Sequence, residues 1–161
     1  MGQSIGLLVF TRVAENRFNT GFKQRILNVY SLFPELHGRP IKCGFIRNSS
    51  RIAGSARSWT VPQQIAFQCG ASSTTIAHEL THLLQGNGVP HGEKACDVWT
   101  MSRLPVEMAD EQPYYLLSHW QKEKWLRHRG RIKFLCTQAI EMRRTDRAYI
   151  KWLSGQLRQL R

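Results

Sequence analysis

The stretch HELTH, from His78 to His82, constrains the fold more than any other part of this sequence. Residues four apart in an α-helix lie one turn apart on the same face, so the two histidines of a helix here project together. The apolar residues of the segment fall on the opposite face: Ile76, Leu80, Leu83 and Leu84. We therefore predict an amphipathic helix that packs its leucines on a core and turns His78 and His82 toward a polar site.

Polar residues and glycines mark the ends of this helix. Ser72 or Ser73 can cap its start, and Gly86-Asn87-Gly88 ends it. A second helix is predicted from Glu93 to Leu104, ending before Pro105. The two helices are therefore joined by a short connection.

The rest of the chain shows alternating and helical patterns. Short alternating runs predict strands at 41–46, 55–61 and 65–68, which can form a small sheet. Helical spacing of apolar residues predicts helices at 18–32 and 131–160, the second with a break near Thr145 or Gly155. A small sheet followed by helices indicates an α+β fold.

The two predicted helices carry residues suited to a catalytic metal ion. His78 and His82 can share one ion, and Glu79 lies on the flank of their face, where its carboxylate can act as general base on a metal-bound water. Glu93 and Asp97 are again four residues apart. Glu93 can complete the ligand set, and Asp97 can accept a hydrogen bond from a ligand histidine and fix its tautomer.

HExxH followed by ExxxD resembles the gluzincin branch of the zincin metallopeptidases, and the chain is closest in size to the minigluzincins. The resemblance implies a zincin-like domain with a small mixed sheet, an active-site helix and a helical C-terminal extension. It implies one Zn²⁺ held by His78, His82 and Glu93, with Glu79 as general base and Asp97 as the partner of a histidine. The expected substrate is a peptide or protein. Minigluzincin-like zymogens also suggest latency, through a C-terminal segment lying over the cleft.

The third ligand has an alternative. Only ten residues separate His82 from Glu93, fewer than in the usual gluzincin connection. His91 is the alternative third ligand, because metzincin-like and SprT-like enzymes use a third histidine. The metzincin pattern itself is not met, since Gln85 and Gly88 stand where a glycine and a histidine are required. Glu93 is favoured over His91 because only Glu93 is followed by an aspartate one turn later.

Two further parts of a peptidase site have candidates. A donor must stabilise the developing oxyanion, and Tyr114, Tyr115 and His119 lie downstream where a loop can return to the cleft. By resemblance to zincins, an edge strand beside the active-site helix pairs with extended substrate. Either SARSWTV (55–61) or IAFQ (65–68) can supply this strand.

The positive charge is concentrated near the C-terminus. The chain has a net charge of +12, of which residues 119–161, with twelve Lys and Arg against three acids, carry +9. We therefore divide the chain into a zincin-like metallopeptidase domain at 1–118 and a basic helical extension at 119–161 packed on it. The basic residues of this extension are interleaved with Trp120, Trp125 and Phe134. This pattern gives the alternative function, a nucleic-acid-binding protein with a structural or non-catalytic metal site. In a third alternative for the basic region, the charged residues form a solvated helix face and the tryptophans pack inward.

The remaining sequence features indicate the environment of the protein. Cys43, Cys69, Cys96 and Cys136 form no CxxC pair, so we predict buried free thiols, with one disulfide as the alternative. No run approaches the roughly 18 apolar residues of a membrane span. We expect an intracellular, cytoplasmic protein with no membrane span.

Overall fold

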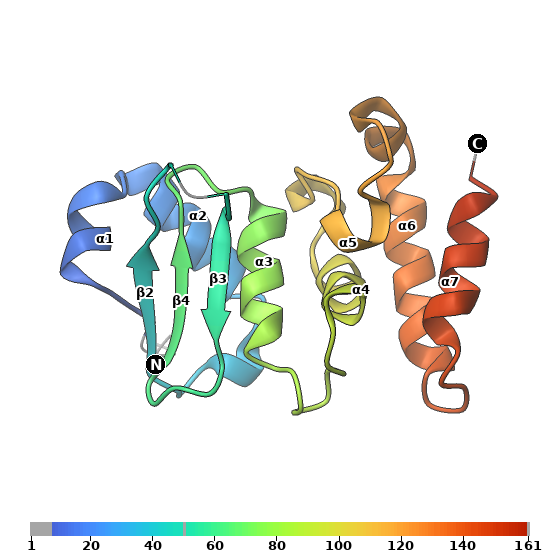
Figure 1. Cartoon of the computed structure of the whole chain (residues 1–161), viewed down its shortest axis with the longest axis horizontal. Coiled ribbons are helices and arrows are strands. Elements are labelled where there is room, and N and C mark those ends of the chain that lie inside the picture. Colours follow the sequence, from blue (N-terminus) through green and yellow to red (C-terminus); the bar gives the residue numbers. More distant parts are fainter. Residues whose placement is uncertain (1–7, 50, 161) are drawn as a thin grey trace, which may run out of the picture.

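The computed structural model describes residues 8–49 and 51–160 and confirms the predicted α+β class (Figure 1). The described elements are, in chain order, β1 (Leu8–Phe10), α1 (Arg12–Arg17), α2 (Thr20–Tyr30), η1 (Pro34–Leu36), β2 (Ile41–Phe45), β3 (Gly54–Arg57), β4 (Gln63–Phe67), α3 (Ser73–His82), α4 (Glu93–Arg103), η2 (Val106–Met108), α5 (Tyr114–Leu117), α6 (Lys122–Met142) and α7 (Tyr149–Arg158). The η elements are 3₁₀ helices.

The sheet is small and mixed, in the strand order β1-β2-β4-β3. β1, β2 and β4 are parallel, whereas β3 pairs antiparallel with β4 and forms one edge. Figure 1 shows α3 beside β3 at this edge. β4, which includes IAF of the IAFQ run, has a strand on both sides and therefore offers no free edge. The prediction that IAFQ (65–68) could pair with an extended substrate is therefore wrong. Among the described strands, β3 is the edge strand beside α3, and β1 is the outer strand on the other side of the sheet.

The strand predicted at 55–61 is shorter than expected. β3 ends at Arg57, and the chain then turns back toward β4. Trp59 is 77% exposed and Val61 is 99% exposed. Their alternation, which had suggested a strand face, instead belongs to this exposed turn.

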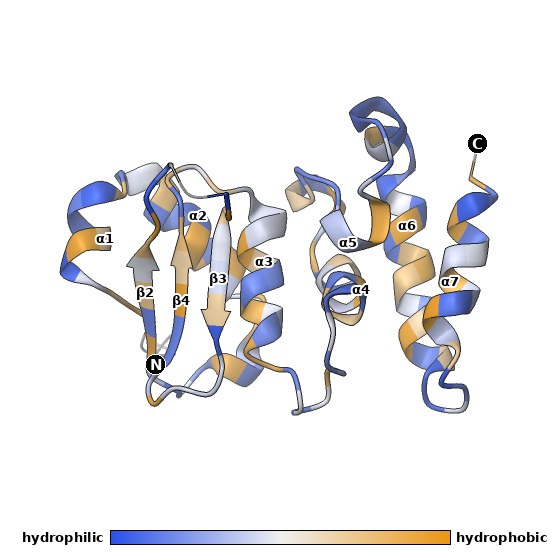
Figure 2. Cartoon of the chain, in the orientation of Figure 1, coloured by the Kyte–Doolittle hydropathy of each residue, from blue (hydrophilic) through white to orange (hydrophobic). Residues whose placement is uncertain are grey.

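The buried residues form two clusters. The first lies between the sheet and α2 and α3, and includes Ile41, Ile65, Ile76 and Leu80, each at most 1% exposed. Figure 2 shows apolar stretches in β2, β4, α2 and α3. The leucine face of α3 is thus buried as the helical spacing predicts.

The second cluster joins the C-terminal helices to α4. Val98 and Met101 of α4 pack with Leu135 of α6 and Leu153 of α7, and none of the four is more than 2% exposed. α5 belongs to the same cluster through Leu116 and Leu117. Trp99 of α4 packs against both clusters, so α4 joins them, and Leu116 and Leu117 pack with the C-terminal helices.

Several elements differ from the sequence predictions. β1 and α1 were not predicted, and α6 begins at Lys122, well before residue 131. The predicted break near Thr145 is confirmed, since α6 ends at Met142 and α7 begins at Tyr149. The first turns of α6 are rich in Lys and Arg, which hides their helical period even though Trp125 is buried.

The cysteines and the helices test two further expectations. All four cysteines are free thiols, but only Cys43, Cys96 and Cys136 are buried, so the prediction is wrong for the exposed Cys69. The Cys69 thiol lies at the surface and donates to the carbonyl oxygen of Arg17, 3.5 Å away. Within residues 8–49 and 51–160, no helix is long and apolar enough to cross a membrane.

Candidate metal centre

Local capping fixes the start of α3, the helix that carries both histidines. Ser72 is the N-cap, and its hydroxyl accepts from the backbone N–H of Thr75 at 2.9 Å. The Asp110 carboxylate accepts from the N–H groups of Ser73 and Thr74, at 3.0 and 3.1 Å. A carboxylate at this position is also stabilised by the positive end of the helix dipole. Both contacts hold the helix that presents the histidines.

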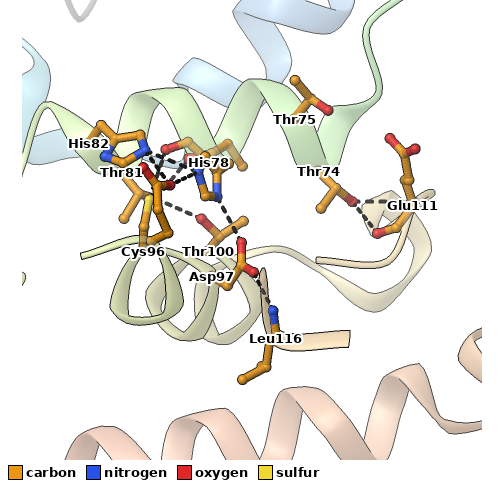
Figure 3. Close-up of polar contacts among 12 residues, drawn as sticks. Thr74, Thr75, His78, Thr81, His82, Cys96, Asp97, Thr100, Glu111 and Leu116 are labelled. Carbon is orange, nitrogen blue, oxygen red and sulfur yellow. Dashed lines mark hydrogen bonds and ion pairs between the residues drawn. The ribbon is translucent and has the colours of Figure 1, made fainter. Parts of the chain in front are cut away.

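Three ligand atoms converge between α3 and α4. The Nε2 atoms of His78 and His82 lie 3.0 Å apart, and Oε2 of Glu93 lies 3.1 Å from the first and 3.2 Å from the second. Figure 3 shows the two imidazole rings turned toward one another. Ligand atoms about 2.0–2.1 Å from a tetrahedral zinc ion lie about 3.3 Å from each other. The observed triangle is therefore close to the size that such an ion requires.

Hydrogen bonds determine which nitrogen of each histidine carries the proton. Nδ1 of His78 lies 2.8 Å from Oδ1 of Asp97, a carboxylate that can only accept. Nδ1 of His82 lies 2.7 Å from Oε1 of Gln85, whose Nε2 donates to the carbonyls of Pro90 and Gly92. Both Nδ1 atoms are therefore donors. In the neutral imidazoles both Nε2 lone pairs then point at the centre of the triangle.

This arrangement suits a cation. Two Nε2 lone pairs and a carboxylate oxygen repel one another at 3.0–3.2 Å unless a metal ion or a proton lies among them. Burial on its own lowers the pKa of His78, but the hydrogen bond and charge of Asp97, with the charge of Glu79 and the hydrogen bond to Glu93, outweigh it and raise that pKa. The residues thus stabilise positive charge at this point.

Cys96 competes with Glu93 as the candidate third ligand. His78, His82 and Cys96 form a group that could hold a metal ion, since their ligand atoms all lie within 4.8 Å of one another. The Cys96 thiol, however, donates to the carbonyl oxygen of His78 at 3.1 Å. Burial and the neighbouring carboxylates raise its pKa and so disfavour the thiolate that binds metal. Glu93 Oε2 lies 3.1 and 3.2 Å from the two imidazole nitrogens, so the geometry favours Glu93.

Glu79 lies next to the histidines but is turned toward the sheet. Its side chain is only 8% exposed, and burial raises its pKa, although the nearby His78 and His82 lower it. A Cβ atom added to Gly54 of β3 would lie 2.7 Å from its Cγ. A glycine at this position of the edge strand therefore leaves the room that the Glu79 carboxylate occupies.

A cleft of about 1120 Å³ brings these residues together. β3 contributes Gly54, Ser55 and Ala56 to one wall. The other wall is formed by α5 and the start of α6: Tyr114, Tyr115, Lys122 and Trp125. The C-terminal helices therefore contribute directly to the site, and the edge strand lies within it.

The predicted oxyanion donors differ in position. The Tyr115 ring stacks on His78 with centroids 5.8 Å apart and an interplanar angle of 20°, and burial and the charges of Glu93, Asp97 and Glu79 raise its pKa. Tyr114 lines the same cleft and is 70% exposed. His119 is exposed and is not among the described residues that line the cleft. Tyr115 is thus the donor candidate nearest the ligands.

His91, the alternative third ligand, also lies apart from the triangle. It is exposed, its ring lies beside Gly86, and it is not among the described residues of the cleft. The tight turn with positive φ at Gly86 and Gly88 brings Glu93 back to the histidines within the short connection. The geometry therefore favours Glu93 over His91.

Asp97 links the ligands to the C-terminal helices. It is 2% exposed, and while Oδ1 accepts from His78, Oδ2 accepts from the backbone N–H of Leu116 at 2.9 Å (Figure 3). Leu116 belongs to α5, which also carries Tyr115. One carboxylate therefore orients a ligand histidine and holds the segment that stacks against it.

The basic C-terminal residues are partly used in packing. Trp120 and Trp125 are 7% and 1% exposed, so both tryptophans pack inward as the third alternative for the basic region predicts. Lys133 donates to the carbonyls of Ser102 and Leu104, at the end of α4. Phe134 remains 50% exposed, with the Arg131 guanidinium 5.0 Å from its ring centre. Nucleic-acid binding stays a prediction, supported by the exposed face of α6 rather than by the tryptophans.

In comparisons with known proteins, no family model, no curated protein and no solved structure matches this chain. The family and the activity are therefore argued from the site alone.

Two residues of that site, Gln85 and Cys96, were not predicted as parts of it. Gln85 follows the second histidine by three residues and Cys96 follows Glu93 by three. Helical spacing was a usable signal only for Cys96, because Gln85 lies beyond the last residue of α3.

Replacing Gln85 by alanine is expected to lower zinc affinity about 10- to 100-fold, the range typical of residues that support a metal ligand. The substitution removes the acceptor for His82 Nδ1 and the two bonds that tie the turn to the segment before Glu93. Competition with a chromophoric chelator measures the affinity. Gln138→Ala, on the exposed face of α6, is the matched control. Equal affinities for the two variants would refute the role of Gln85.

Proposed function

We propose that the protein is a zinc-dependent metallopeptidase of the gluzincin type, with a zincin-like fold. The observation that carries this proposal is the triangle of His78 Nε2, His82 Nε2 and Glu93 Oε2, with edges of 3.0–3.2 Å, beside the buried Glu79. The free edge of β3 in the same cleft supports an extended peptide as substrate.

The residues divide into ligands, base and positioning groups. His78, His82 and Glu93 would hold one Zn²⁺, with Cys96 as the competing third ligand. When bound, such an ion supplies a water of lowered pKa and polarises a carbonyl. Glu79, with its raised pKa, accepts the proton of the attacking water and passes it to the leaving amine.

Other side chains complete the proposed mechanism. Tyr115 is the candidate to donate a hydrogen bond to the developing oxyanion, because its ring lies against His78. Asp97 and Gln85 keep both Nδ1 atoms protonated. The start of α6 forms part of one wall of the cleft, and latency through the C-terminal segment stays a prediction.

The test combines metal content with hydrolysis. Purified protein is expected to contain one zinc ion per chain and to cleave unstructured peptides or a casein substrate. A strong chelator should remove both properties, and added Zn²⁺ should restore both together. Protein that binds no zinc, or that is fully loaded with zinc yet cleaves no peptide in a broad library, would refute the proposal.

Zinc affinity is expected to fall on acidification, starting above pH 6.5, the ordinary pKa of histidine. The pKa of His78 is raised, so a proton competes with zinc for its Nε2 at a higher pH than for an ordinary histidine. Below that pKa, affinity should fall about tenfold per pH unit for this single proton. Chelator competition at a series of pH values measures the decline. In Asp97→Asn the pKa of His78 should drop, and the decline should move to lower pH.

A further inference from the structure

The start of α6 forms a part of the cleft that the proposed chemistry does not use. Lys122 and Trp125 both line the cleft, and they are three residues apart in the first turn, so they share one face of the helix. The chain runs from α5, which carries Tyr114 and Tyr115, through a short connection into this end of α6 (Figure 1). Lys122 and Trp125 therefore lie in the same cleft as the metal centre, where they can contact part of a ligand.

The indole of Trp125 contains an unused donor. Trp125 is 1% exposed, and its Nε1 has no hydrogen-bond partner within the described chain. Buried polar groups in native proteins are nearly always paired, and Trp125 is a lining residue of the cleft, so we take its unpaired donor to point to an acceptor on a ligand. Because indole N–H can only donate, that ligand group must carry an acceptor atom.

The start of α6 is the part of the cleft that favours an anionic acceptor. α6 has 21 residues, and its N-cap, Gln121, makes no side-chain capping bond, so the positive end of the helix dipole is not capped by a side chain. The Lys122 ammonium adds a full positive charge at the same place. Glu123 in the same turn is exposed and is not among the described residues of the cleft, whereas Asp110, Glu111 and the acids of the metal centre do line the cleft. The donors, rather than net charge alone, therefore distinguish this corner of the cleft.

We propose that Lys122, Trp125 Nε1 and the start of α6 bind a carboxylate group of a peptide in the cleft. A carboxylate has two acceptor oxygens and one negative charge, which match an indole donor and an ammonium group. The identity of the ligand as a peptide rests on the proposed function. The carboxylate belongs either to the C-terminus of the peptide or to an Asp or Glu side chain.

The experiment measures binding without cleavage. Full-length protein carrying Glu79→Gln is titrated with N-terminally fluorescent peptides of one apolar sequence, at near-physiological salt to screen non-specific attraction. The peptides end in a free carboxylate or in an amide, and two further amidated peptides carry an internal Glu or Gln. At least one carboxylate peptide should bind about tenfold more tightly than its neutral partner. The pair that shows the difference identifies the source of the carboxylate.

Three variants then test the residues. Lys122→Met and Trp125→Phe should each remove most of the preference for the carboxylate, the second by deleting only the N–H of a buried ring. Arg127→Met, which removes an exposed charge of α6 outside the described cleft, should keep it. Equal binding of acid and amide peptides would overturn the proposal, as would equal losses in Lys122→Met and Arg127→Met. If Trp125→Phe does not fold, Lys122→Met still decides.

The outcome for this site is separable from the outcome for the proposed function. Binding is repeated after zinc is removed by a chelator, and hydrolysis is measured separately with the unsubstituted protein. A carboxylate preference without any hydrolysis would overturn the peptidase and leave this binding site standing. Hydrolysis without a carboxylate preference would overturn this binding site and leave the peptidase proposal standing.

Discussion

Glu79→Gln is expected to lower peptide hydrolysis at least about 10²- to 10⁴-fold, the contribution typical of general acid–base catalysis, and to leave zinc bound. Glutamine has nearly the same shape as glutamate and fits the space beside Gly54, where the side chain is 8% exposed. It cannot accept the proton of the attacking water. Rates with a quenched fluorescent peptide and zinc content by atomic absorption provide the two measurements.

The control must separate loss of the base from loss of charge. Glu111 lines the same cleft, but its carboxylate makes no described contact with the histidines. Glu111→Gln should therefore keep the rate within about threefold, the modest effect of a surface charge. A Glu79→Gln protein that cleaves at the parental rate would exclude Glu79 as the base, whatever metal it holds.

The raised pKa of Glu79 affects how well its carboxylate can act as a general base. Burial disfavours its charged form and moves its pKa up from 4.5, while His78 and His82 limit the shift. A general base works best when its pKa approaches the working pH. Glu79 combines a base of raised pKa with a position between the ligand histidines and the edge strand.

The sequence predicted the parts of the site that a single helix face determines. The spacing of His78 and His82 and the leucines opposite them set the orientation of α3, because helix geometry alone separates the two faces. The spacing of Glu93 and Asp97 likewise places both side chains on one face of α4, where both contact His78. These patterns need no knowledge of how distant parts of the chain meet.

The parts that were not predicted depend on a turn and on a tertiary contact. Gln85 contacts His82 from beyond the end of α3, where the turn at Gly86 and Gly88 brings Pro90 and Gly92 back to its amide. The approach of Gly54 to Glu79 depends on where β3 lies in the sheet. Helix spacing does not describe the turn, and no local pattern describes the packing of β3 beside α3.

Glu93→Ala is expected to lower zinc affinity by more than about 100-fold, beyond the range of supporting residues, whereas Cys96→Ala is expected to change it only a few-fold. Glu93 Oε2 lies 3.1 and 3.2 Å from the two imidazole nitrogens, and its removal leaves two protein ligands. The Cys96 proton is already shared with the His78 carbonyl, and burial and nearby acids raise the pKa of the thiol. Chelator competition on both variants gives the comparison.

The pair of variants distinguishes two kinds of metal site, because the ligand set determines what the site can do. A His, His, Glu set on surface-accessible atoms leaves room for water, as hydrolytic zinc sites require; Glu93 is 45% exposed at its side chain. A His, His, Cys set would draw the ion toward the buried Sγ of Cys96, away from the cleft and from β3. If Cys96→Ala lost zinc and Glu93→Ala kept it, the peptidase proposal would lose its ligand set. Thermal unfolding of both metal-free variants checks that lost affinity reflects ligation rather than a weakened fold.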